Sequence, residues 1–223
     1  MRTTRVVLAG ASGMVGGIAL KHCLAHDRVA AVTVIGRRPL GVTHPKLSEV
    51  IHTDFSDFTD AANHFNEKDL ALFCVGAYSG AVPDDVFRRI TVDCTVAFAK
   101  ALLAGSPQAA FCLLSGQGAD PAEKSRVAFA RYKGMAENAL LGMGFPRVHL
   151  FRPGYIYPVT PRQEPNLMYT VSRWLYPLMR RVVPNIGISS EDLAKAMVTV
   201  GLNGRDNPDP VLENRAIRAE AAL

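Results

Sequence analysis

The chain has 223 residues, of which 48% are apolar and 20% are charged, and its mean hydropathy is +0.10. This composition is typical of a globular protein and excludes intrinsic disorder and collagen-like structure. The net charge of +5 suits an anionic ligand, but the basic residues are spread along the chain, so we expect no nucleic-acid partner. The longest uncharged stretch, 101–119, is interrupted by Gly105, Ser106 and Pro107, so we expect no membrane span.

The cysteines indicate a reducing compartment. Cys23, Cys74, Cys94 and Cys112 lie in apolar segments, and none forms a C-x-x-C pair. We expect buried, reduced thiols. The apolar run near the N-terminus is interrupted by glycines, so it does not form the apolar core of a secretory signal. We therefore expect a cytoplasmic protein.

Short apolar runs alternate with segments of helical periodicity. Six runs are predicted to be strands, namely 5–9, 31–35, 50–55, 70–75, 110–114 and 148–151. Four segments are predicted to be helices, namely 14–26, 86–103, 120–143 and 190–202. The helix at 120 is expected because Asp120, Pro121 and Glu123 are typical of a helix N-terminus. Strands that alternate with helices predict right-handed crossovers and a parallel sheet in an α/β fold.

The alternation ends at Tyr155, after which several prolines surround one helical stretch. We expect a single domain over 1–223, with 155–187 as a small irregular region on the substrate side. An apolar stripe in this region is predicted to line the substrate cleft or to form a subunit contact in a homodimer; the alternative is a helix on a membrane surface. The stripe comprises Leu167, Val171, Trp174, Leu175 and Leu178, with Arg173, Arg180 and Arg181 around it.

A glycine-rich segment directly follows the first predicted strand and opens the first predicted helix. In that context the first glycine permits a tight turn, the second lets backbone N–H groups approach a pyrophosphate, and the third lets helix and strand pack closely. The helix N-terminus then faces the diphosphate. We therefore predict a pyrophosphate site formed by Gly10, Ala11, Ser12, Gly13, Met14, Val15 and Gly16, and the alternative is a glycine-rich turn without a ligand.

The end of the second predicted strand indicates which dinucleotide is bound. A free ribose 2′-hydroxyl is usually held by Asp or Glu at this point. This chain has Arg37 and Arg38 instead. Arginine pairs with a 2′-phosphate, which an acidic residue would repel, so the sequence favours NADP(H) over NAD(H). The alternative is an ordinary solvated pair of charges.

Seven segments carry a family resemblance, and they span nearly the whole chain. They are 8–13, 35–38, 92–93, 113–120, 133–137, 151–154 and 212–214. In these segments the chain resembles the short-chain dehydrogenase/reductase superfamily, in its atypical and extended branches, and most of all the Tat-interacting-protein-type oxidoreductases. The resemblance implies a Rossmann-like, doubly wound sheet with the dinucleotide across its carboxyl edge. It also implies that Asp54 and Phe55 lie near the adenine, and that the loop after Val75 and Gly76 passes the nicotinamide-side ribose.

The resemblance further implies hydride transfer between a nicotinamide and a carbonyl or alcohol carbon. In that chemistry a tyrosine donates a proton, a lysine four residues later binds the ribose, and a serine polarises the carbonyl. Ser115 and Lys133 match the serine and the lysine, but Phe129 occupies the tyrosine position. If Tyr132 were the tyrosine instead, Ala136 would stand where the lysine belongs. Neither register gives the dyad, because both side chains must lie on one helix face.

Two functions therefore remain open. The first is an NADP(H)-dependent oxidoreductase on an unidentified carbonyl or alcohol substrate, with Tyr78, Tyr155 or Tyr157 as a relocated proton donor. The second is a non-catalytic NADP(H)-binding redox sensor or regulator. We expect no metal site, although His22 and His26 are spaced so that both face one side of a helix.

Overall fold

The central sheet of the computed structural model, which describes residues 3–77, 80–159 and 187–223, has seven parallel strands. Their spatial order is β3-β2-β1-β4-β5-β6-β9, so the chain winds outward in both directions from β1 and β4. This order confirms the Rossmann-like, doubly wound fold, in which ligands bind where the order reverses. The strands are β1 (Thr4–Ala9), β2 (Val29–Gly36), β3 (Leu47–Ile51), β4 (Leu70–Phe73), β5 (Ala110–Leu114), β6 (Arg147–Arg152) and β9 (Val211–Glu213).

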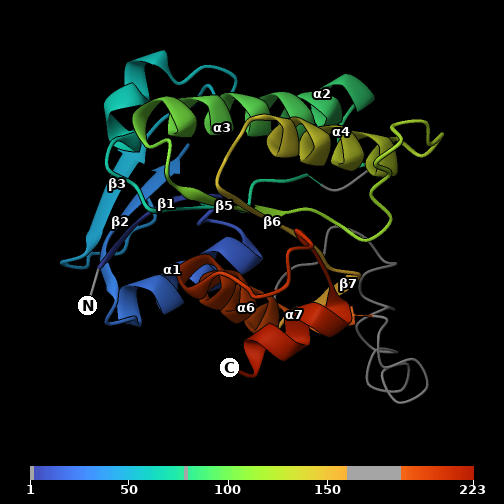
Figure 1. Cartoon of the computed structure of the whole chain (residues 1–223). Helices are drawn as coiled ribbons and strands as arrows, with labels where there is room; N and C mark the ends of the chain where they lie inside the picture. Colours follow the sequence, from blue (N-terminus) through green and yellow to red (C-terminus); the bar gives the residue numbers. More distant parts are fainter. Residues whose placement is uncertain (1–2, 78–79, 160–186) are drawn as a thin grey trace.

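Helices cover both faces of the sheet (Figure 1). One layer holds α1 (Met14–Ala25), α6 (Ser190–Asn203) and α7 (Asn214–Ala221). The other layer holds α2 (Asp84–Arg88), α3 (Cys94–Gly105) and α4 (Ala128–Gly142), together with the 3-10 helix η1 (Thr59–Phe65) and the π-helical turn η2 (Arg89–Asp93). Two short strands, β7 (Tyr155–Tyr157) and β8 (Gly187–Ser189), pair beside the main sheet. Within the described ranges, no helix has the length and apolar character needed to cross a bilayer.

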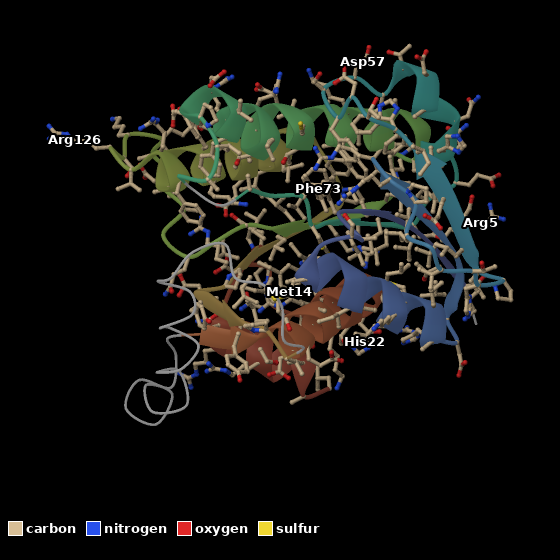
Figure 2. All side chains as sticks on the ribbon, turned by 180° about the vertical axis from the view of Figure 1, so that it is seen from behind. Arg5, Met14, His22, Asp57, Phe73 and Arg126 are labelled. Atoms are coloured by element: carbon tan, nitrogen blue, oxygen red, sulfur yellow. The ribbon has the colours of Figure 1, made fainter. Side chains whose placement is uncertain are left out.

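The strands are buried because both of their faces are covered. Along β1, Val6 and Leu8 pack towards α1 and α6, whereas Val7 and Ala9 pack towards the other layer. Phe73 lies in the interior between sheet and helices (Figure 2), 5.1 Å from Phe98 between ring centroids. Burying one such side chain contributes about 1.5–3 kcal/mol, so these rings fix the helices against the strand ends that carry the site.

The prediction of a helix from residue 120 is wrong, because α4 begins at Ala128. The Asp120 carboxylate accepts hydrogen bonds from the backbone N–H groups of Ala122, Lys124 and Ser125, at 2.9, 2.8 and 2.7 Å. These bonds satisfy the donors of a loop, not of a helix turn. Aspartate stabilises both kinds of turn by the same kind of hydrogen bond, so the sequence pattern does not separate them.

Other elements differ from the prediction at their ends. The third strand is Leu47–Ile51, which leaves Asp54 and Phe55 in the loop that follows it. The long helix predicted at 86–103 is α2, η2 and α3 in succession, with a π-helical turn between the two α-helices. All four cysteines are free thiols, and all except Cys74 are buried. The apolar stripe predicted within 167–178 lies outside the described residues.

Candidate functional site

The turn between β1 and α1 needs glycine at two positions for packing. Gly10 has φ 88°, and a Cβ atom there would lie 2.6 Å from the carbonyl carbon of Cys74. A Cβ atom at Gly16 would overlap the carbonyl oxygen of Gly10. At Gly13 the nearest atom to a Cβ would be the same oxygen at 3.2 Å, so this position has more room. The first and third glycines therefore close the turn, and the first and second line a cavity.

The N-terminus of α1 opens onto this turn. Gly13 is the N-cap, no side chain caps the helix, and its first turn carries no acidic residue. The first N–H groups of a helix have no partner within the helix and carry a partial positive charge. An anion placed at the turn would therefore meet unoccupied backbone donors without repulsion from a carboxylate in that turn.

A cavity of about 620 Å³ extends from this turn past the ends of β2 and β3; we call it the arginine cavity. Three arginines, Arg37, Arg38 and Arg89, line it against a single acidic residue, Asp54. All three arginines are exposed, so they lie at its rim. The remaining lining residues are Gly10, Ala11, Ser12, Gly13, Val34, Gly36, Leu40, Thr53, Phe55, Ser56, Cys74, Val75, Gly76, Val86, Ile90 and Cys94.

Arg89 is a cavity residue that the sequence analysis missed. It begins the π-helical turn η2, and such turns are rare and frequently found at functional sites. Helical periodicity gives no signal for one. Asp54 lies in the same cavity, where hydrogen bonds from Ser56 lower the pKa of its carboxyl, with smaller contributions from His52 and Arg89. Asp54 is therefore ionised, and the arginines still outnumber it.

A second cavity of about 440 Å³ lies past the ends of β5 and β6; we call it the lysine cavity. Four residues, Gly13, Cys74, Val75 and Gly76, line both cavities, so the two adjoin along the carboxyl edge of the sheet. Its walls are mostly apolar. The lining residues that it does not share are Met14, Val15, Ala77, Leu114, Ser115, Gly116, Phe129, Lys133, Pro153, Gly154, Tyr155, Ile156 and Pro158.

Lys133 supplies the charge of the lysine cavity. It is only 9% exposed, and its Nζ donates a hydrogen bond to the carbonyl oxygen of Leu114 at 3.1 Å. Burial lowers the pKa of the ammonium to about 8, and the nearby carboxylate of Glu137 opposes that shift. Close to neutral pH this lysine can therefore both donate hydrogen bonds and lose a proton.

The structure distinguishes the two possible tyrosine positions on α4. Phe129, one turn before Lys133, lines the same cavity, and its ring lies against Gly116. Tyr132 lines neither cavity; its hydroxyl donates to Asp84 Oδ2 at 2.5 Å. The side chain that shares a face with the lysine is thus the phenylalanine.

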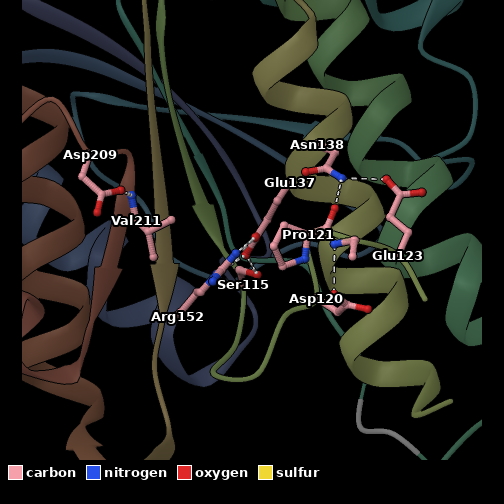
Figure 3. A network of polar contacts seen from close by, with 10 residues as sticks. Ser115, Asp120, Pro121, Glu123, Glu137, Asn138, Arg152, Asp209 and Val211 are labelled. Atoms are coloured by element: carbon pink, nitrogen blue, oxygen red, sulfur yellow. Dashed lines mark hydrogen bonds and ion pairs between the residues drawn. The ribbon is translucent and has the colours of Figure 1, made fainter. Parts of the chain in front are cut away.

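A buried network fixes Ser115 (Figure 3). Its hydroxyl donates to Glu137 Oε1, and Arg152 Nε contacts the two oxygens of Glu137 at 3.0 and 3.1 Å. Glu137 is only 1% exposed. The backbone joins the same elements, because Ser115 N donates to Phe151 O at 2.8 Å. Helix α4 and strand β6 therefore hold the serine in one orientation.

Of the remaining predicted residues, some line a cavity and others do not. Tyr155 lines the lysine cavity, Tyr157 lines neither cavity, and Tyr78 lies outside the described residues. Gly16, predicted in the pyrophosphate site, also lines neither cavity. His22 pairs with Glu191, its Nε2 lying 2.7 Å from Oε1. The other predicted site residues all line one cavity or both.

Two kinds of curated protein resemble the chain. It is 31% identical to the rat protein HTATIP2 over 166 residues, which cover 74% of this chain and 66% of the rat protein. It is 26% identical to the mitochondrial protein fmp52 of Emericella nidulans over 217 residues, which cover 92% of this chain and 90% of that protein. No family model matches the chain.

Solved structures share the fold at low sequence identity. A short-chain dehydrogenase from Burkholderia cenocepacia in complex with NADP is 18% identical, with a TM-score of 0.68, and covers 99% of this chain and 93% of its own. Gre2 from Candida albicans in complex with NADPH is 16% identical, with a TM-score of 0.71, and covers 94% of this chain and 78% of its own.

Proposed function

We propose that this chain, which belongs to the atypical short-chain dehydrogenase/reductase family, binds NADP(H) and is an oxidoreductase on a carbonyl or alcohol substrate. The observation that carries the proposal is the arginine cavity, where three arginines face one aspartate beside an uncapped helix N-terminus. The curated relatives support the family, and the two neighbours named with NADP or NADPH support the cofactor.

The two adjoining cavities would together hold NADP(H) along the carboxyl edge of the sheet. The backbone from Gly10 to Gly13 would hold the pyrophosphate, because the turn lacks side chains that would fill it. Arg37 and Arg38 would pair with the 2′-phosphate. Asp54 and Phe55, in the same cavity, would lie on the adenosine side.

The lysine cavity would then receive the nicotinamide end and the substrate. The cofactor supplies or accepts a hydride there. Lys133 would donate hydrogen bonds to ribose hydroxyls, and Val75 and Gly76, which line both cavities, would pass beside that ribose. Tyr155, Ile156 and Pro158 form part of the wall of the lysine cavity, so the described residues 155–159 would lie on the substrate side.

Calorimetric titration with NADPH and NADH tests the cofactor. Charge-assisted bonds to a phosphate contribute about 1.5–3 kcal/mol, so NADPH is expected to bind at least about tenfold more tightly than NADH. Arg37→Ala is expected to remove most of that preference. Arg126→Ala is the matched control, since it removes the same charge from an exposed position that lines neither cavity (Figure 2). Equal affinities for both cofactors in the wild type would contradict the proposal.

Turnover is a separate measurement. NADPH consumption with a panel of aldehydes and ketones, and NADP⁺ reduction with the corresponding alcohols, test the oxidoreductase. Reduction is expected to be slow, because Phe129 cannot donate a proton. Tight NADPH binding with no turnover in either direction would contradict the catalytic half of the proposal and leave the cofactor half intact.

A further inference from the structure

The hydroxyl of Ser115 carries one hydrogen, and the structure shows where that hydrogen goes. Arg152 donates hydrogen bonds to both oxygens of the buried Glu137, so this side chain serves as a hydrogen-bond acceptor on both of its oxygens. The short contact between Ser115 Oγ and Glu137 Oε1 therefore has the serine as donor. Ser115 has no second hydrogen to offer to a ligand.

In this orientation Ser115 cannot donate a hydrogen bond to the carbonyl oxygen of a substrate. To polarise a carbonyl, a hydroxyl must donate its hydrogen to the carbonyl oxygen. The Ser115 oxygen retains lone pairs, and the residue lines the lysine cavity. Towards that cavity it is an acceptor. Lys133, in the same cavity, is a donor.

Given the proposed function, on which this step depends, we infer that the lysine cavity selects a substrate whose reacting group is a hydroxyl, which donates to Ser115, and that Glu137 and Arg152 are positioning residues for this contact. A hydroxyl group donates and accepts at once, so it matches Ser115 and Lys133 together. A ketone oxygen accepts only, so it matches Lys133 and leaves Ser115 without a partner. The apolar remainder of the cavity, including Leu114, Phe129 and Ile156, suits a hydrocarbon body on the alcohol.

The surroundings of the network explain why the orientation persists. Arg152 is the last residue of β6 and is only partly buried, but its side chain donates three hydrogen bonds to Glu137. Hydrogen bonding to Glu137 raises the pKa of Arg152 above its ordinary value, so the guanidinium stays charged near neutral pH. The carboxylate of Glu137 is thus compensated by Arg152, and the serine adds one more hydrogen bond to it.

The test measures ligand binding on NADP⁺-loaded protein by ligand-detected NMR titration. The probes are 1-methylcyclohexanol, a tertiary alcohol that cannot lose a hydride, and cyclohexanone, which NADP⁺ cannot reduce. Both are redox-inert under these conditions and similar in size. The wild type is expected to bind the alcohol about tenfold more tightly than the ketone, which corresponds to one additional hydrogen bond.

Three variants separate the effect of the Ser115 hydroxyl from that of Glu137, which holds it. Ser115→Ala is expected to weaken binding of the alcohol and leave that of the ketone unchanged, so that the tenfold preference disappears. Ser115→Thr keeps a hydroxyl and is expected to keep the preference. In Glu137→Gln the amide can donate to Ser115, which frees the serine hydrogen, so the preference is expected to shift towards the ketone. A purely structural role for Glu137 would weaken both probes alike.

Three outcomes would overturn the inference. They are equal loss of both probes in Ser115→Ala, tighter binding of the ketone by the wild type, and binding of neither probe. If Glu137→Gln fails to fold, the comparison of Ser115→Ala with Ser115→Thr decides the acceptor role without it. Failure of the proposed function is seen separately, because NADP⁺ would then not bind in the titration that precedes the probes.

Discussion

Replacing Phe129 with tyrosine tests how one oxygen atom limits turnover. Phe129 and Lys133 line the same cavity one helical turn apart, so a phenol at 129 would stand on the face that carries the ammonium. The tip of the phenylalanine ring, Cζ, points at Gly116, so a hydroxyl on Cζ needs a small shift of the ring or of the loop that carries Gly116. The nearby cation would lower the pKa of the phenol, which is the direction that proton transfer near neutral pH requires.

The expected increase in the rate of ketone reduction depends on the groups around the new hydroxyl. A positioned acid contributes about 10²–10⁴-fold, which corresponds to about 3–5 kcal/mol of the barrier. Ser115 is adjacent to Gly116 and is an acceptor, so its oxygen would compete for the phenolic hydrogen. We therefore expect Phe129→Tyr to increase the rate of ketone reduction by about 10²-fold, at the lower end of that range.

The assay is NADPH consumption with a panel of ketones at equal cofactor occupancy in both proteins. Tyr132→Phe is the control: its hydroxyl bonds to Asp84 outside both cavities, so turnover is expected to stay unchanged while unfolding becomes easier by about 1 kcal/mol. A folded Phe129→Tyr protein that binds NADPH and gains no activity would refute the reasoning. Fast turnover by the wild type that Tyr155→Phe abolishes would show that Tyr155 is the proton donor.

Three further predictions concern the groove and the core. Arg89→Ala is expected to weaken NADPH binding about tenfold in calorimetry, because the change removes one of the three positive charges that line the arginine cavity. Gly13→Val is expected to leave the fold intact and abolish NADPH binding, whereas Gly16→Val is expected to lower the melting temperature as well, because its side chain would overlap the Gly10 backbone. Burial, aided by Arg147 and Arg205, lowers the pKa of His149 to about 4, and within the described part of the chain neither ring nitrogen has a hydrogen-bond partner. The unfolded chain therefore takes up this proton first, so stability is expected to be complete above pH 6.5 and to fall by about 2 kcal/mol at pH 5 in urea titrations, a loss that His149→Leu would remove.

Features that depend on neighbours along the chain were predictable from the sequence. Gly16 is required by packing against the Gly10 backbone six residues earlier, and Arg37 and Arg38 directly follow β2, so each signal lies within a short segment. The bond from Ser115 to Glu137 joins residues 22 positions apart on different elements, and no periodicity reveals it. Arg89 reaches the cavity from a π-helical turn, whose extra residue breaks the spacing from which a helix face is read.

The residues of α4 that match the family pattern differ in what else they do. A Cβ atom at Gly134 would overlap the Asp120 carbonyl oxygen, so glycine is needed for the loop after β5 to pack on the helix. Glu137 is needed because Arg152 would otherwise be a partly buried charge without its partner. Their presence is therefore explained by packing and charge compensation, whether or not the protein catalyses a reaction. Phe129 is different, because the tyrosine of the family pattern differs from it by a single oxygen and the fold is formed without that atom. The family pattern on this helix thus predicts how the groove is built, while the rate of proton transfer has to be measured at residue 129.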